Sequence, residues 1–243
     1  MSAPVLDAAT LRAIVATYRD ALIEHREAIN VLNVYPVPDG DTGTNMALTM
    51  ESVTAEVDAA GDDLAAVCGA ISHGSLMGAR GNSGVIMCQL LRGLCDVLTL
   101  APADGEAFAE ALTGAATAAY GAVGNPVEGT ILTVAREASE AASATVADNA
   151  TELVPVLDAA RAEAAASLDR TPDLLPVLAE AGVVDAGGAG FLLFLDAMLA
   201  VTDSRPIPEP EVPADGPVLT GPSATASGDG TKDVSELRYE VMY

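Results

Sequence analysis

Two aspartates separated by a single glycine, Asp39 and Asp41, are the residues whose types and spacing best suit chemistry. They belong to the segment NVYPVPDGDTGTNM, residues 33–46, in which two carboxylates of one turn can point at neighbouring ions. Magnesium prefers oxygen ligands and usually takes one or two carboxylates together with phosphate oxygens. The segment therefore predicts a magnesium site for a phosphorylated ligand. An ordinary Asp-Gly turn remains an alternative, whereas the spacing and final glutamate of an EF-hand calcium loop are absent.

The polar residues that follow Asp41 suit the binding of phosphate. They lie where this loop is expected to enter a helix, and backbone N–H groups at a helix N-terminus attract anions. Threonine hydroxyls at the same place add hydrogen-bond donors. The candidates for phosphate contact are Thr42, Gly43, Thr44 and Asn45.

A second glycine-rich segment, GARGNSG at residues 78–84, precedes an apolar helix and is a further phosphate candidate through Gly81, Asn82 and Ser83. It is not a P-loop, because the GK[ST] ending is missing. Arg80 is the basic residue among these loops, so we expect it to contribute positive charge to catalysis. A plain helix cap is the alternative for this segment, and a solvated or capping side chain is the alternative for Arg80.

Two more loops carry weaker signals. Thr130, in PVEGT, either caps the next helix or contacts a nucleotide. Asp185 and Gly187, in VVDAGGAG, are candidates for holding a ribose hydroxyl or a base, although no strand precedes them as in a dinucleotide-binding fingerprint. His25 is expected on a solvated helix face, and a phosphohistidine or general base at His73 is a minor alternative.

These loops separate segments with helical spacing of apolar residues, and alanine, the best helix former, is abundant. The sequence predicts an all-α fold of about eight helices, with the polar loops gathered at one end of a bundle. Helices are expected over residues 7–31, 45–59, 62–77, 85–101, 104–123, 130–146, 152–168 and 174–181, and from residue 191 to about residue 201.

Composition narrows the function classes. The formal net charge is −24, and so acidic a surface disfavours both nucleic acid and an anionic membrane as partners. No apolar run reaches the roughly 20 residues of a membrane span, so membrane insertion is not expected. The start of the chain does not resemble a signal peptide, so we expect a cytoplasmic protein. The three cysteines, Cys68, Cys88 and Cys95, are expected to be buried free thiols.

The chain is predicted to divide into three parts. Residues 1–203 are expected to form the helical domain that carries the four loops. Residues 204–233, rich in proline and then in Ser, Gly and Thr, are expected to be an acidic linker. Residues 234–243 are interpreted as the start of a further domain that is cut short.

The four loop motifs, in this order, resemble the nucleotide-binding domain shared by bacterial fatty acid kinase and the ATP-binding subunit of dihydroxyacetone kinase, the DhaL-like family. NVYPVPDGDTGTNM, LMGARGNSGVI, NPVEGTILTVAREA and AGVVDAGGAG are most similar to the fatty acid kinase branch. The resemblance covers residues 10–201.

This resemblance implies an antiparallel eight-helix barrel that holds ATP in the loops at one end. It implies two Mg²⁺ ions bridged by Asp39 and Asp41, with Asn33 in roughly the place of a third aspartate ligand. Thr130, Asp185 and Gly187 would lie nearer the adenosine. The residues that would face the phosphates are Thr42, Thr44, Asn45 and Ser83.

The resemblance also implies an activity, transfer of the ATP γ-phosphate to the carboxylate of a fatty acid. A fatty carboxylate is already ionised at neutral pH, so no general base is needed, and none is evident in the sequence. The acyl chain would be presented by a separate DegV-like fatty-acid-binding protein, and the full-length protein would be a possible homodimer. The alternatives are a dihydroxyacetone-type kinase subunit, a nucleotide-binding regulatory module without turnover, and a purely structural bundle.

Overall fold

The structure is a computed structural model that describes residues 4–99 and 102–210, and in this part it contains ten helices and no strand. The all-α prediction is therefore confirmed. The helices are α1 (Ala8–Leu32), α2 (Thr42–Ala59), α3 (Leu64–Gly78), α4 (Gly81–Leu98), α5 (Gly105–Ala122), α6 (Ile131–Ala147), α7 (Leu153–Asp169), α8 (Thr171–Leu174), α9 (Pro176–Ala181) and α10 (Ala186–Asp203).

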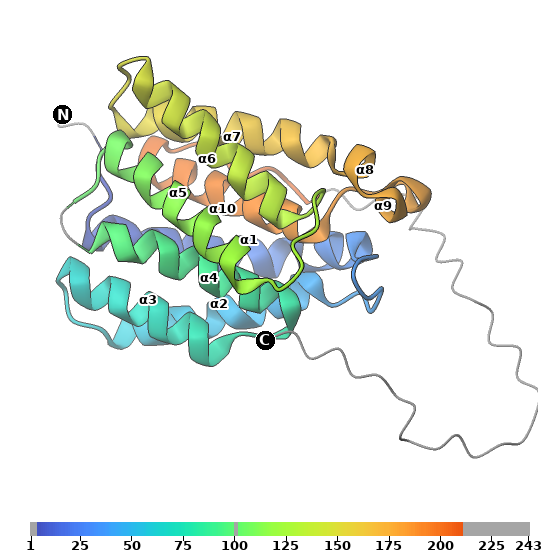
Figure 1. The fold of residues 1–243 in the computed structure, drawn as a ribbon. Coiled ribbons are helices and arrows are strands. Elements are labelled where there is room, and N and C mark those ends of the chain that lie inside the picture. The colour runs from blue at the N-terminus through green and yellow to red at the C-terminus, as the bar shows by residue number, and fades with distance from the viewer. Residues whose placement is uncertain (1–3, 100–101, 211–243) are drawn as a thin grey trace, which may run out of the picture.

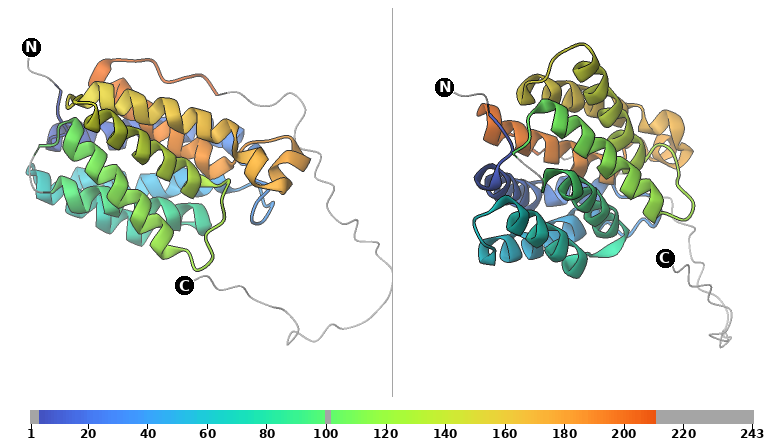
Figure 2. Two further views of the ribbon diagram at one scale, coloured as in Figure 1. Left: turned by 45° about the horizontal axis from the view of Figure 1, so that its top comes forward. Right: turned by 60° about the vertical axis from the view of Figure 1, so that its left-hand side comes forward.

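The eight long helices form a closed ring. Each of α1 to α7 packs against the next, α10 packs against α7, and α10 returns to pack against α1 (Figures 1 and 2). Successive helices run in opposite directions, so the ring is the expected antiparallel barrel. The short helices α8 and α9 lie in the connection between α7 and α10, where Pro176 forces Leu175 into an extended conformation and breaks the single helix expected over 174–181.

Alternation of direction brings four connections to one end of the barrel, on the right in Figure 1. They are residues 33–41, 79–80, 123–130 and 170–185. The helices that start at this end are α2, α4, α6 and α10, so four helix N-termini face the same region. We call this end of the barrel the loop end.

Three of these helices begin earlier than the sequence indicated. The starts of α2, α4 and α10 are Thr42, Gly81 and Ala186, and each lies inside a segment that was expected to be loop. Several of the glycines there serve helix packing, whereas Gly81 has the left-handed backbone conformation, φ 57°, that is typical of a turn. A methyl group at Gly188, for example, would press against the side chains of Leu168 on α7 and Val134 on α6.

Gly43 allows an even closer approach, and its replacement gives a stability prediction. A methyl group there would collide with the backbone carbonyl of Arg26 on α1, which cannot turn aside as a side chain can. We expect Gly43→Ala to lower the free energy of unfolding by about 1–3 kcal/mol, the usual cost of overpacking. Gly69→Ala is the control, because that helical glycine is exposed with open space around it. Urea denaturation should show that Gly69→Ala is more stable than the wild type by about 0.5–1 kcal/mol.

The barrel interior is apolar and well filled. Tyr18 is 1% exposed, donates a hydrogen bond from its hydroxyl to the carbonyl of Gly190 at 2.9 Å, and packs edge-on against Phe194. Burial raises the pKa of this phenol well above its usual range. All three cysteines are free and buried, as expected.

Helix α10 has the length and apolar composition of a membrane span. It is nevertheless one of the eight helices of the ring, held between α1 and α7, and most of its apolar side chains are buried there. We therefore interpret it as a core helix.

After α10 the chain reverses direction at Ser204, which has a left-handed conformation. Arg205 then forms an ion pair with Asp158 of α7, and Ile207 packs against the main core. These residues are the first of the predicted linker. The rest of that linker and the predicted further domain lie outside the described residues.

Candidate functional site

A cavity of about 820 Å³ opens at the loop end of the barrel. The first turns of α2, α4, α6 and α10 contribute to its walls, together with the loops before α2 and α6. Its lining combines hydroxyl and amide groups with apolar side chains, a composition typical of sites for small organic ligands. The lining residues are Tyr35, Pro36, Val37, Thr42, Asn82, Ser83, Ile86, Val123, Gly124, Asn125, Val127, Thr130, Ile131, Leu132, Asp185 and Gly187.

Four helix N-termini around one cavity create a site that favours negative charge. Each N-terminus carries roughly half a positive elementary charge and several backbone N–H groups without helical partners. Arg80 adds a cation at the N-cap of α4, where a positive charge is unfavourable for the helix itself. These positive groups share the loop end with the carboxylates of Asp39, Asp41 and Asp185.

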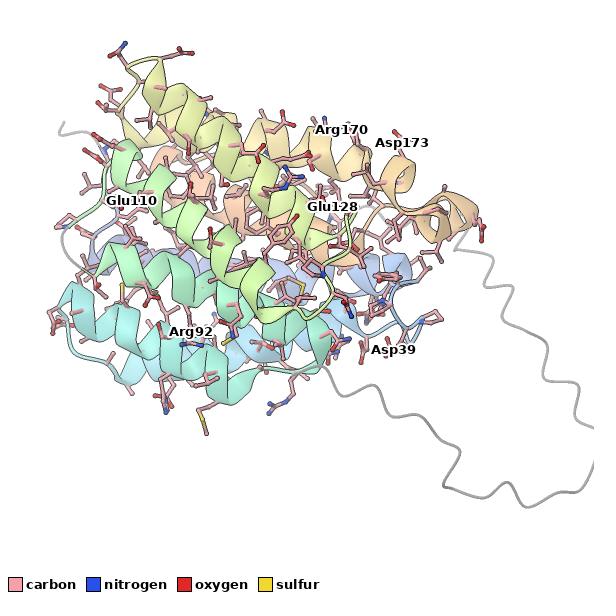
Figure 3. All side chains as sticks on the ribbon, in the orientation of Figure 1. Asp39, Arg92, Glu110, Glu128, Arg170 and Asp173 are labelled. Atoms are coloured by element: carbon pink, nitrogen blue, oxygen red, sulfur yellow. The ribbon has the colours of Figure 1, made fainter. Side chains whose placement is uncertain are left out.

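Asp39 and Asp41 lie in the loop before α2, and Figure 3 shows Asp39 at the loop end. Asp39 is exposed, but partial desolvation by the loop and then the nearby Asp41 carboxylate raise the pKa of Asp39. Two carboxylates that repel each other in this way form a ready site for a cation. In residues 4–99 and 102–210 no group of three or more acidic, histidine or cysteine side chains could hold a metal. A donor set of two carboxylates fits magnesium, which completes its coordination with water and phosphate oxygens.

Asn33 is buried beneath this loop, 5% exposed, with its amide fully engaged. Its Oδ1 accepts hydrogen bonds from the backbone N–H groups of Asp41 at 3.1 Å and Thr42 at 3.2 Å. Its Nδ2 donates to the carbonyl of Val37 at 3.0 Å. The geometry supports a role in holding the loop rather than the predicted role as a metal ligand.

The candidates for phosphate contact after Asp41 differ in their surroundings. Thr42 is buried, lines the cavity and accepts a hydrogen bond from Ser83 of α4 at 3.3 Å, so the first turns of α2 and α4 are joined. Thr44 faces α1, where Asn30 donates to its hydroxyl at 3.0 Å. Gly43 packs on α1, and the Asn45 amide lies directly against Gly81. Of these four residues, only Thr42 borders the cavity.

In the connection between α3 and α4, Asn82 and Ser83 line the cavity, whereas Arg80 and Gly81 do not. The Arg80 guanidinium is exposed and donates to the carbonyls of Gly78 and Ala79, both at 3.1 Å. It forms no ion pair with any of the residues described, so its charge is available to a ligand that reaches the loop end.

Thr130 and Asp185 both cap helices and line the cavity. The Thr130 hydroxyl accepts from the backbone N–H of Leu132 at 3.4 Å, and Asp185 accepts from that of Gly188 at 2.7 Å. Asp185 is 6% exposed, and burial raises its pKa to about 6 despite the N–H groups that face it. Gly187 packs against Ile131 and completes this wall.

The apolar wall of the cavity was not predicted from the sequence. Val123, Val127 and Ile86 form part of it, and single apolar residues beside glycines carry no distinctive signal. The loop before α6 is fixed by Glu128, which accepts hydrogen bonds from Tyr120 at 2.9 Å and Thr133 at 2.7 Å. These contacts hold the wall in place from α5 and α6.

The two histidines lie outside the cavity lining. His73 is exposed on α3, with Nδ1 3.4 Å from the Glu56 carboxylate, and nothing there suggests a phosphohistidine. His25 is half-buried, and its Nε2 is buried without a hydrogen-bond partner among the described residues. The expectation of a solvated His25 is therefore wrong.

The model of one protein family, the DAK2 domain, matches residues 36–200, which is more than half of the chain. The chain belongs to the DAK2 domain family. This match includes three of the loop motifs completely and the aspartate loop from Pro36 onward.

Relatives of this DAK2 domain are longer proteins. Protein YloV of Bacillus subtilis is 45% identical over 214 residues, which cover 87% of this chain and 38% of that protein. An uncharacterized protein of Staphylococcus aureus (strain NCTC 8325 / PS 47) is 44% identical over 183 residues, covering 73% of this chain and 33% of that protein. The chain therefore matches only 33–38% of the length of these relatives.

Among solved structures, the crystal structure of the dihydroxyacetone kinase of C. freundii is similar to this DAK2 domain, with a TM-score of 0.54. The match covers 82% of this chain and 34% of that one at 20% sequence identity. At that identity it supports the fold alone, which agrees with the helical barrel described above.

Proposed function

We propose that this DAK2 domain binds ATP with magnesium and serves phosphoryl transfer. The observation that carries the proposal is the pairing of Asp39 and Asp41 beside a cavity bordered by four helix N-termini. The carboxylates suit a divalent cation, and the helix N-termini suit the phosphates of a nucleotide. Neither feature alone would hold a magnesium–nucleotide complex, but together they complement both of its parts.

Within the cavity we assign the phosphates to Thr42, Asn82 and Ser83, which are closest along the chain to the aspartate loop and Arg80. The sugar and base are assigned to the opposite wall, where Thr130 and Asp185 provide polar groups and Val123 and Val127 an apolar surface. Two magnesium ions, when bound, would neutralise the charge of the triphosphate. In this assignment Asp39 and Asp41 hold the metal, and Arg80 stabilises charge on the transferred group.

For the acceptor, we propose the carboxylate of a fatty acid, presented by a separate DegV-like acyl carrier protein in the cytoplasm. The only carboxylate of the cavity lining, Asp185, is assigned above to the sugar and base, and the lining contains no histidine, lysine or glutamate that could serve as a general base. A carboxylate acceptor needs no such base, because it is ionised at neutral pH. Catalysis would then consist of positioning and of stabilising charge in a loose transition state.

A dihydroxyacetone-type acceptor is the second candidate, favoured by the similarity to the C. freundii kinase fold. A hydroxyl acceptor loses a proton during transfer, so it would require a base, either Asp185 of the lining, whose pKa burial raises to about 6, or a group from outside the lining. A nucleotide-binding module without turnover is the third candidate, and it would bind magnesium–ATP in the same cavity.

The first test is calorimetric titration of the domain with a non-hydrolysable ATP analogue, with and without magnesium. We expect binding that depends on magnesium, because two adjacent carboxylates repel a free triphosphate. A well-folded domain that binds no nucleotide under either condition would refute the proposal. Phosphate transfer by the full-length protein to a fatty-acid-loaded carrier, compared with dihydroxyacetone, then separates the acceptors, and binding without any transfer would favour the regulatory module.

A further inference from the structure

Among the described helices, five begin with an aspartate at the N-cap, and one of these aspartates behaves differently from the others. An N-cap aspartate normally accepts a hydrogen bond from a backbone N–H of the first turn. The side chain of Asp41 makes no such bond, although it occupies the N-cap of α2. The other four aspartates each accept such a bond from a backbone N–H: Asp7 from Thr10 at 2.8 Å, Asp63 from Ala66 at 2.9 Å, Asp104 from Ala107 at 3.1 Å and Asp185 from Gly188 at 2.7 Å.

The first turn of α2 is capped instead by two asparagines, Asn30 in the last turn of α1 and Asn33 directly after that helix. Asn30 accepts from the backbone N–H of Thr44 at 3.1 Å, the same N–H that the Asp41 carboxylate would take in an ordinary cap. The Asn30 amide also donates to the Thr44 hydroxyl at 3.0 Å. Asn33 accepts from the N–H groups of Asp41 and Thr42. The N–H groups of Asp41, Thr42 and Thr44 are thus satisfied by side chains from outside α2.

We propose that Asn30 and Asn33 are positioning residues that cap α2 in place of Asp41 and so keep the Asp41 carboxylate free for the cation. This inference rests on the proposed function for its purpose, but the capping itself does not. A carboxylate bonded to its own helix amide offers fewer lone pairs to a metal and is turned toward the helix axis. With Asn30 in place, the N–H of Thr44, which corresponds to the donor that the other N-cap aspartates use, is already taken.

The chemistry of Asn33 requires an amide. Its oxygen accepts two N–H bonds while its nitrogen donates to the Val37 carbonyl, and a carboxylate can only accept. An aspartate at this position would therefore repel the Val37 carbonyl and loosen the loop that carries Asp39. If Asn33 were a metal ligand, the same aspartate would strengthen metal binding, because carboxylates are the preferred ligands of magnesium.

Asn33→Asp therefore gives opposite results for the two roles. We expect the affinity for magnesium, measured by calorimetry in the presence of ADP, to fall about 10- to 100-fold, as for loss of other groups that orient metal ligands. An unchanged or higher affinity in the variant would overturn the positioning role of Asn33. Failure of the wild-type domain to bind magnesium and ADP would refute the proposed function instead.

The capping is tested separately in the metal-free protein, where neither activity nor ligand is needed. In wild-type protein, Asn30→Ala frees the N–H of Thr44, and the Asp41 carboxylate can turn to cap it. In an Asp41→Ala background no such replacement exists, so the same substitution should lower the midpoint of thermal unfolding more. A larger shift in that background supports the proposal, and equal shifts in both backgrounds would overturn it.

Discussion

Asp41→Asn should remove magnesium-dependent nucleotide binding and leave the barrel folded. We expect the affinity for a magnesium–nucleotide complex to fall by at least about 100-fold, the upper range for groups that merely orient a ligand. The carboxylate is not used in capping α2, and asparagine is itself a good N-cap residue. Calorimetric titration measures the binding, and the midpoint of thermal unfolding should stay within a few degrees of wild type.

The matched control for this variant is Asp63→Asn. Asp63 is also an N-cap aspartate, it starts α3 at the end of the barrel away from the cavity, and its replacement makes the same change in net charge. The control should bind magnesium and nucleotide like wild type. Equal losses in both variants would attribute the effect to overall charge, and unfolding of Asp41→Asn alone would show that the residue is structural.

Asp185→Asn should change the pH dependence of stability more than any other single substitution of a carboxylate in the site. Burial raises the pKa of Asp185 from 3.8 to about 6. The stability associated with this raised pKa is fully present below pH 3.8 and is lost as the pH rises through 6. At pH 7 the buried, ionised carboxylate costs about 3 kcal/mol, since each pKa unit corresponds to about 1.4 kcal/mol.

The asparagine variant cannot ionise, and its Oδ1 can still accept the N–H of Gly188. Urea denaturation should therefore show equal stability of variant and wild type near pH 4 and a more stable variant at pH 7. Asp104→Asn, at an exposed N-cap, serves as the control and should show no such divergence between the two pH values. If the free energies of unfolding of Asp185→Asn and the wild type changed with pH in parallel, ionisation of Asp185 would not destabilise the fold.

Groups with perturbed pKa values are concentrated at functional sites. The Asp185 carboxylate, which destabilises the fold when ionised, is therefore a candidate for ligand binding. The position of Asp185 in the cavity wall supports its assignment to a hydroxyl of the ligand. The same variant should then bind the nucleotide more weakly although it is more stable.

Most of the fold could be predicted because amphipathic helix spacing is a local signal. The gathering of four loops at one end also followed, since short connections make successive helices antiparallel neighbours. The closed ring was implied only by the resemblance to a known family. The starts of α2, α4 and α10 could not be placed correctly. Glycine is a loop signal along the sequence, and only the packed structure shows that Gly43 and Gly188 admit neighbouring helices.

For the candidate site, the sequence identified residues that the structure brings to one end, among them Thr42, Ser83, Thr130 and Asp185. It could not assign the direction of each side chain. Thr44 lies two residues after Thr42, which lines the cavity. Its side chain nevertheless points to α1, because the packing of α1 against α2 places Asn30 beside it. Such contacts depend on how two helices meet, which no motif records.

The closed ring has a consequence for the order of the helices along the chain. Because the number of long helices is even, α1 begins and α10 ends side by side, at the end opposite the cavity. A circular permutant could join Asp203 to Ala8 through a short connector and open the chain between Asp148 and Asn149, in the exposed turn after α6. Every cavity loop would remain continuous in such a protein. The position of the N- and C-termini along the ring is thus independent of which residues line the cavity.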